Sequence, residues 1–220
     1  MCRIKDVLMN KCVILFLFCC VLLIPSIQAS GQTKTEHAAW LFLSAEQSLS
    51  KKCALSADVQ ARSATHLDYL TVLLLRPGLV YKITEKQSAT VGYAYSGSWE
   101  KEAGAKTYTL ENRIWEQYEV DGRVGRIELT NRLRLEQRFI QKEKDVFAQR
   151  LRYFIKTRIP LATDKDFTKG WYAGLQNELF LNVQNKENIN NKTFDQNRLN
   201  GALGYRFSKS WDVEAGYLYR

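Results

Sequence analysis

The chain has 220 residues, 45% of them hydrophobic, and a formal net charge of +9. Its basic residues alternate with apolar ones along predicted strands instead of clustering on a helix, and its start predicts export. We therefore exclude nucleic acid as a partner. Four of the five cysteines lie before Pro25, so the exported part would keep only Cys53, which excludes an internal disulfide.

Residues 1–29 are predicted to be a signal peptide. A basic start precedes an apolar run of about twelve residues, which fits the roughly 7–15 residues of a signal core and is too short for a membrane-spanning helix. Pro25 ends this run, and Ala29 is a small residue suited to cleavage. We therefore expect an exported protein with a single mature domain over residues 30–220.

The rest of the chain shows the period-two alternation of apolar and polar side chains that is typical of β-strands. Several predicted strands exceed the usual length of about 5–6 residues and reach the roughly 9–11 residues that a tilted strand needs to cross a bilayer. The predicted strands cover residues 38–49, 53–62, 67–83, 87–97, 107–120, 124–140, 146–160, 171–183, 194–207 and 211–219.

The alternation is strictest between residues 125 and 160. One face of these strands would be apolar, with residues such as Leu133 and Leu151, and the other charged, with residues such as Arg134 and Arg152. In a soluble sandwich the charged face would lie outside in water, whereas in a membrane barrel the apolar face would lie against lipid. The long strands favour the barrel, because a sandwich of this size prefers shorter strands.

The connections between the predicted strands alternate in length. Short turns near one rim and long polar loops at the other are typical of bacterial outer-membrane barrels, whose short turns face the periplasm. Only the connection at residues 162–170 is longer than this pattern requires. The short connections are predicted at residues 51–52, 84–86, 121–122 and 208–210, and the long ones at 63–66, 97–106, 141–145 and 184–193.

Three of these turns predict which residues face each other. A two-residue turn at 121–122 has the Asp-Gly sequence that favours tight hairpins, and three-residue turns are predicted at 84–86 and 208–210. Apart from Val120 and Arg123, which flank the first turn, the predicted pairs place polar residues opposite polar ones and apolar residues opposite apolar ones. The predicted pairs are Val120–Arg123, Glu111–Arg132, Arg113–Thr130, Leu79–Val91, Leu75–Tyr95, Arg206–Asp212 and Tyr205–Val213.

The charged face would line the lumen of the barrel. Its residues could interlock as ion pairs that fill the lumen, or they could form a basic-lined path for small anions, because bases outnumber acids among them. Glycines on the same face, such as Gly92 and Gly204, would make room for long arginine side chains. The candidate lumen-lining residues are Glu111, Arg113, Arg132, Arg134, Glu136, Arg138, Arg150, Arg152, Lys156, Arg158, Glu178, Arg198 and Arg206.

The sequence offers little support for catalysis. After the predicted signal peptide the histidines are His37 and His66, and the single cysteine is Cys53. These residues form no spacing that is typical of a metal site, a nucleophile elbow or a phosphate-binding loop. We therefore expect a protein that is not an enzyme and that has no catalytic residues, no cofactor and no metal.

Several segments together resemble the bacterial family catalogued as domain of unknown function 2490. The resemblance implies an exported outer-membrane-type β-barrel and no assigned activity. Family members continue past the final Gly-Tyr-Leu segment, so the comparison leads us to expect either that this chain lacks a closing C-terminal strand or that its barrel closes differently. The segments that carry the resemblance are Arg76–Tyr81, Val91–Tyr95, Glu111–Gln117, Arg132–Arg138, Asn197–Arg198 with Gly201–Tyr205, and Glu214–Leu218.

Together these observations predict an all-β fold, an up-and-down antiparallel transmembrane β-barrel with about 10 visible strands, or about 10–12 if it is closed. We expect an outer-membrane location, with outer-membrane lipid and the barrel assembly machinery as partners, and small anions as ligands if the lumen is open. A structural or adhesive barrel acting through the loops at 97–106 and 184–193 is a competing interpretation. The sequence is also compatible with a secreted or periplasmic β-sandwich or lipocalin-like binding protein, and with a lipid-modifying barrel enzyme.

Overall fold

The computed structural model describes residues 38–64, 67–102, 105–142 and 144–220. The predicted signal peptide at 1–29 and both candidate histidines, His37 and His66, lie outside these residues.

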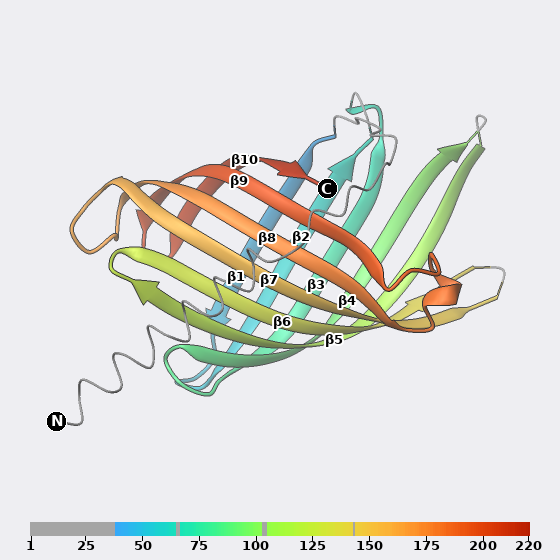
Figure 1. Cartoon of the computed structure of the whole chain (residues 1–220), viewed down its shortest axis with the longest axis horizontal. Coiled ribbons are helices and arrows are strands. Elements are labelled where there is room, and N and C mark those ends of the chain that lie inside the picture. Colours follow the sequence, from blue (N-terminus) through green and yellow to red (C-terminus); the bar gives the residue numbers. More distant parts are fainter. Residues whose placement is uncertain (1–37, 65–66, 103–104, 143) are drawn as a thin grey trace. The chain divides into compact units, whose positions relative to one another are not determined.

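Within the described residues the protein is a single all-β sheet (Figure 1). All the predicted strands are present, in chain order, and each pairs antiparallel with the strand before and after it, so the up-and-down fold is confirmed. The strands are β1 (Trp40–Ser48), β2 (Cys53–Ser63), β3 (Leu70–Lys82), β4 (Gln87–Glu102), β5 (Ala105–Val124), β6 (Ile127–Ile140), β7 (Val146–Thr163), β8 (Gly170–Gln184), β9 (Phe194–Ser208) and β10 (Trp211–Tyr219).

The sheet curls into a half-barrel instead of a closed barrel. Among the described residues, β1 pairs only with β2 and β10 pairs only with β9, so each leaves one edge unpaired. Because the strands alternate in direction, β1 and β10 run antiparallel to each other. The curl gives the sheet a concave inner face and a convex outer face (Figure 1).

The connections gather at two rims. We call the end with residues 49–52, 83–86, 125–126, 164–169 and 209–210 the turn rim, and the end with residues 64, 67–69, 141–142, 144–145 and 185–193 the loop rim. The last of these connections includes a short 3-10 helix, η2 (Lys186–Asn188).

The prediction of a long loop at residues 97–106 is wrong. There β4 and β5 continue as a hairpin that pairs Glu102 with Ala105. The rings of Trp99 and Tyr108 pack across the two strands with centroids 5.3 Å apart. Such cross-strand aromatic pairs stabilise a hairpin, which explains why a segment with polar residues remains extended.

The turn predicted at residues 121–122 is also wrong. These residues lie inside β5, and the chain turns at Gly125, whose φ of +60° suits the first central position of a tight hairpin turn. Consequently Glu111 faces Ile140, and Arg113 faces Arg138. The register moves by an even number of residues, so the predicted faces of both strands are retained.

The other two turns give the predicted registers. The turn between β3 and β4 pairs Leu79 with Val91, and the turn between β9 and β10 pairs Arg206 with Asp212. The remaining pairs predicted for these two hairpins are also present.

Burial is inverted relative to a water-soluble sandwich. On the outer face the side chain of Leu133 is 47% exposed, whereas Glu136 on the inner face is 1% exposed. No second sheet covers the apolar face in the described part of the chain, so the β-sandwich interpretation is wrong as a fold. The charged residues take the place that a hydrophobic core would have in a sandwich.

Candidate functional site

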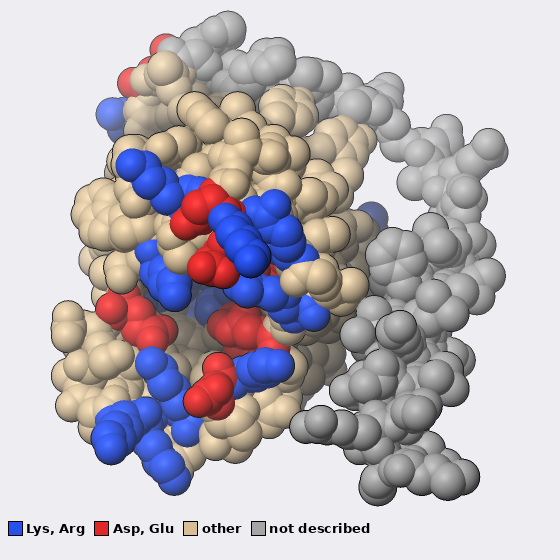
Figure 2. Space-filling view, turned by 90° about the vertical axis from the view of Figure 1, so that its left-hand side faces the viewer, with Lys and Arg blue, Asp and Glu red and all other residues tan. Residues whose placement is uncertain are grey.

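All the charged residues predicted to line a lumen lie on the inner face of the curled sheet. Figure 2, which looks at the turn rim, shows basic and acidic side chains gathered around a hollow. The buried members are Glu111, Arg113, Arg134, Glu136, Arg138, Arg150, Arg152, Glu178 and Arg206, and the partly buried ones are Arg132, Lys156, Arg158 and Arg198.

Glu136 is the centre of the largest group of ion pairs. Its Oε2 accepts hydrogen bonds from Arg150 on β7, at 2.6 Å from Nη2, and its Oε1 accepts one from Arg152 Nη1 at 2.5 Å. Arg152 also donates to Glu178 on β8 at 2.6 Å, and Glu178 in turn accepts from Arg132 at 3.0 Å. The alternating charges therefore run across three neighbouring strands, in the charge-assisted geometry that makes such bonds strong.

A second group lies where β5 and β6 pair. Glu111 Oε1 accepts hydrogen bonds from Nε of Arg113 at 2.7 Å and from Nε of Arg138 at 2.5 Å. Arg113 and Arg138 face each other directly in the sheet. A single carboxylate thus holds together two arginines that would otherwise repel each other.

Ion pairs near the turn rim connect strands that are not neighbours. Arg206 on β9 donates to Glu128 on β6 at 2.9 Å, and Lys156 on β7 donates to Glu214 on β10 at 2.7 Å. Strands three places apart lie about 14 Å from each other along a flat sheet. The curl of the sheet brings these strands close enough for the ion pairs to form. Each pair therefore crosses the concave side of the sheet.

Trp115 fills part of the inner face, and it does so over glycines. Gly78, Gly92 and Trp115 are consecutive cross-strand partners on β3, β4 and β5. A Cβ atom on either glycine would collide with the indole ring. The glycines therefore make room for an aromatic ring, not for an arginine as predicted, and the guanidinium of Arg134 stacks on that ring at 4.1 Å.

The predicted set of inner-face residues lacks several acids. Asp58 binds Arg76 at 2.7 Å, and Glu128, Asp212 and Glu214 form the ion pairs of the turn rim. The excess of basic residues is therefore smaller than the sequence indicates. Strand parity could have identified these acids, since Glu128 shares the parity of the predicted lumen residues on its strand, and the predicted register places Asp212 opposite Arg206.

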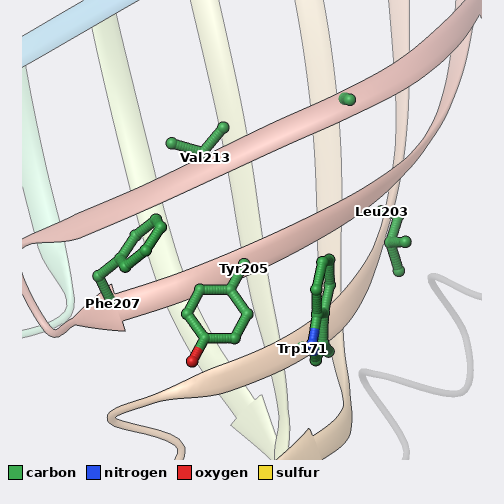
Figure 3. Close-up of a pocket in the computed structure, with 6 residues that line it drawn as sticks. Trp171, Leu203, Tyr205, Phe207 and Val213 are labelled. Carbon is green, nitrogen blue, oxygen red and sulfur yellow. The ribbon is translucent and has the colours of Figure 1, made fainter.

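The outer face carries an apolar groove near the turn rim (Figure 3). Trp171, Leu203, Tyr205, Phe207 and Val213 line it, from β8, β9 and β10. The ring of Tyr205 packs edge-on against the rings of Trp171 and Phe207, with centroid-to-centroid distances of 5.0 Å and 4.8 Å. The groove is thus a cluster of aromatic rings on the convex surface, separate from the charged inner face.

Three further features concern chemistry and membrane helices. In residues 38–64, 67–102, 105–142 and 144–220, no three His, Cys, Asp or Glu side chains are grouped to hold a metal ion. Cys53, at the start of β2, is a half-buried free thiol. No helix in these same residues has the length and apolar character that spanning a bilayer requires.

The comparisons with known proteins agree with the family predicted from the sequence. The family described as "Protein of unknown function (DUF2490)" matches residues 37–220, which include the whole curled sheet. No curated protein and no solved structure matches the chain. The chain therefore belongs to the DUF2490 family of proteins of unknown function.

Proposed function

We propose that this protein is an outer-membrane β-barrel without enzymatic activity, exported through an N-terminal signal peptide, whose interior is closed by ion pairs. The observation that supports this proposal most directly is the inverted burial. Apolar side chains occupy the exposed convex face, and charged side chains are buried on the concave face. An apolar solvent such as the lipid bilayer makes this arrangement favourable, which supports the proposal.

The aromatic residues of the outer face support a membrane location. Trp171, Tyr205 and Phe207 form the groove near the turn rim, and Trp211 is exposed at the start of β10. Aromatic side chains are enriched at the two membrane–water interfaces, where one end of the ring is apolar and the other wet. We therefore assign this cluster to the interface on the periplasmic side, where short turns lie in outer-membrane barrels.

Two pairs of polar residues on the outer face are joined by hydrogen bonds. Asn177 Nδ2 donates to Asn197 Oδ1 at 2.8 Å, and Tyr153 OH donates to Asn131 Oδ1 at 3.0 Å. In hydrocarbon, an unpaired polar group is costly, whereas a paired one is tolerated. The outer face is therefore compatible with lipid in spite of these residues.

The ion pairs between distant strands support a closed interior. Arg206 and Glu128 connect β9 to β6, and Lys156 and Glu214 connect β7 to β10. Their side chains are between 10% and 25% exposed, and each ion pair spans two intervening strands, so the pairs hold these side chains across the interior. Outer-membrane lipid and the barrel assembly machinery are the partners that this function requires.

The unpaired edges of β1 and β10 must also be satisfied in a membrane, because bare backbone groups in hydrocarbon are costly. These two strands run antiparallel, so they can pair directly and close the barrel. We propose that they do so in the outer membrane.

The test combines fractionation with planar-bilayer recording. We expect the mature protein to fractionate with the outer membrane and to require detergent, and we expect the purified protein to show little or no conductance. Glu128→Gln combined with Arg206→Gln should raise the conductance, because it removes the pair between β6 and β9. Lys209→Gln, which removes one charge from a turn of the same rim, is the control and should have no effect.

Two results would contradict the proposal. Recovery of the mature protein in the soluble periplasm without detergent would exclude the membrane barrel. A large conductance in the wild-type protein would exclude the closed interior. If that conductance is anion-selective and falls when Arg134 and Arg152 are neutralised, small anions pass through the barrel.

A further inference from the structure

Two inner-face arginines differ from all the other basic side chains of this face. Arg62 on β2 and Arg198 on β9 have no carboxylate within 4.0 Å among the described residues, whereas the other basic side chains buried or half-buried there each have one. Instead, Arg62 donates to Gln60 at 2.8 Å, and Arg198 donates to Gln196 at 3.3 Å. Both partners are neutral amides.

The same aromatic ring holds both arginines. The guanidinium carbon of Arg62 lies 4.0 Å from the ring centroid of Trp40, and that of Arg198 lies 5.2 Å from it. Arg198 also lies 4.5 Å from the ring of Phe180. The aromatic rings therefore hold two positive charges close together near the loop rim. One charge comes from β2, which neighbours the edge strand β1, and the other from β9, which neighbours the edge strand β10.

The arrangement leaves donors unused. Arg62 Nε is buried and has no hydrogen-bond partner among the described residues. Two guanidinium groups that are close together and lack a carboxylate repel each other, and a bound anion would offset that repulsion. Guanidinium groups match carboxylate and phosphate oxygens in geometry, and each can donate two parallel hydrogen bonds to them.

We propose that Arg62 and Arg198, with Trp40 behind them, form a binding site for a small oxyanion that bears a phosphate or carboxylate group. This inference rests on the proposed function, and it adds to that function the chemical class of a ligand and a binding site near the loop rim. The ligand is either a soluble anion or the phosphate of a lipid headgroup that reaches the inner face near β1.

The binding test uses inorganic phosphate and the mature protein in maltoside micelles, which contain no phosphate. Isothermal titration calorimetry should show saturable binding to the wild-type protein. Arg198→Gln should weaken it roughly tenfold or more, because each charge-assisted contact contributes strongly to affinity. The control is Arg132→Gln, because Arg132 also stacks on an aromatic ring, Phe154, at 4.1 Å, but has a carboxylate partner in Glu178. This variant should keep the wild-type affinity.

A second variant tests the site while keeping both arginines, so that loss of binding cannot come from an arginine substitution that unfolds the protein. Gln196→Glu places a carboxylate where Arg198 now meets an amide oxygen. It should raise the stability of the protein while abolishing phosphate binding. Absence of binding to the folded wild-type protein, or an equal loss in Arg132→Gln, would overturn the site.

A repeat in phosphatidylglycerol nanodiscs distinguishes the two sources of the ligand. If added phosphate binds as it does in micelles, the natural ligand is a soluble anion, and if binding is lost there but not in micelles, a lipid headgroup occupies the site. Binding in micelles is independent of conductance, so a failure of this inference is distinguishable from a failure of the proposed function.

Discussion

Gly92 and Trp115 face each other across β4 and β5, and the indole ring of Trp115 occupies the space that a side chain at position 92 would need. Trp115 is only 3% exposed, and it supports the guanidinium of Arg134 at 4.1 Å. The glycine, the ring and the arginine therefore form one stack on the inner face. An added methyl group at the base of this stack would displace all of it.

We predict that Gly92→Ala lowers the free energy of unfolding by about 1–3 kcal/mol, which is typical of overpacking. Urea unfolding in lipid vesicles, followed by tryptophan fluorescence, measures this change. Gly122→Ala is the control, since a Cβ there has no atom within 4 Å, and it should change stability by less than about 0.5 kcal/mol. Equal effects of the two substitutions would mean that Trp115 does not lie over Gly92.

A charge introduced on the outer face should lower the stability of the protein far more than a charge introduced in a loop. Leu133 lies in the middle of β6 and is 47% exposed on the convex face. If this face contacts lipid, Leu133→Arg should cost about 2–4 kcal/mol near the centre of the bilayer. Leu67→Arg, at an exposed leucine of the loop rim, is the control. A silent Leu133→Arg would show that this face does not contact lipid.

Glu136 should be the most sensitive of the inner-face acids. It is 1% exposed and holds both Arg150 and Arg152. Glu136→Gln would leave two buried cations without this partner, and we expect a loss of about 3–5 kcal/mol in the same unfolding assay. Glu128→Gln should cost less, because the Glu128 side chain is 22% exposed and water screens its pairs. The reverse order would contradict the assignment of Glu136 as the centre of the network.

For nearly every strand, the sequence predicts which side chains lie on the inner face and which on the outer face. This is possible because successive side chains of a strand point to opposite faces, so apolar and polar residues that alternate separate onto the two faces. The register was less predictable. Asp121 and Gly122 have the sequence of a tight turn, but Asp121 instead accepts a hydrogen bond from Thr130 at 2.6 Å within the hairpin. The chain turns at Gly125, which the sequence also allows. Local turn preferences do not decide between two such positions.

The contacts between distant strands were not predictable. The pair of Arg206 and Glu128 exists because the sheet curls enough to bring β9 and β6 together. Similarly, Trp115 lies over Gly78 and Gly92 only because two registers align these residues in one row. Sequence alternation shows that such side chains share a face, but not how strongly that face is curved.

The stability of the connection between β7 and β8 should depend on pH, because Asp164 holds this connection through its carboxylate. The Thr168 hydroxyl and the backbone N–H groups of Lys169 and Thr168 donate hydrogen bonds to its carboxylate, and they lower its pKa below the ordinary value. Because the folded-state pKa is depressed, the stabilisation is present above the unfolded value of about 3.9 and is lost as pH falls through the folded pKa. Asp164→Ala should therefore speed hydrogen exchange of the Thr168 amide at neutral pH.

The difference between Asp164→Ala and the wild type should disappear in acid below the folded pKa. Asp166→Ala, in the same connection, is the control and should leave this exchange unchanged. A difference that persists in strong acid would mean that the carboxylate does not hold the turn.

Direct pairing of β1 with β10 is the remaining step that the proposed barrel requires. Outward-facing positions of the two strands, such as Leu41 and Tyr217, would lie side by side if the edges pair. Cysteines placed there form a disulfide only if their Cα atoms come within about 7 Å. We expect that Leu41→Cys forms a cross-link with a cysteine at one of positions 213, 215, 217 or 219, in a mature protein that carries Cys53→Ser and is embedded in lipid. Leu41→Cys with Leu133→Cys is the control and should not cross-link, because β6 lies five strands away from β1 in the sheet. If none of the β10 positions cross-links while the protein remains folded in the membrane, another segment must lie between the two edges.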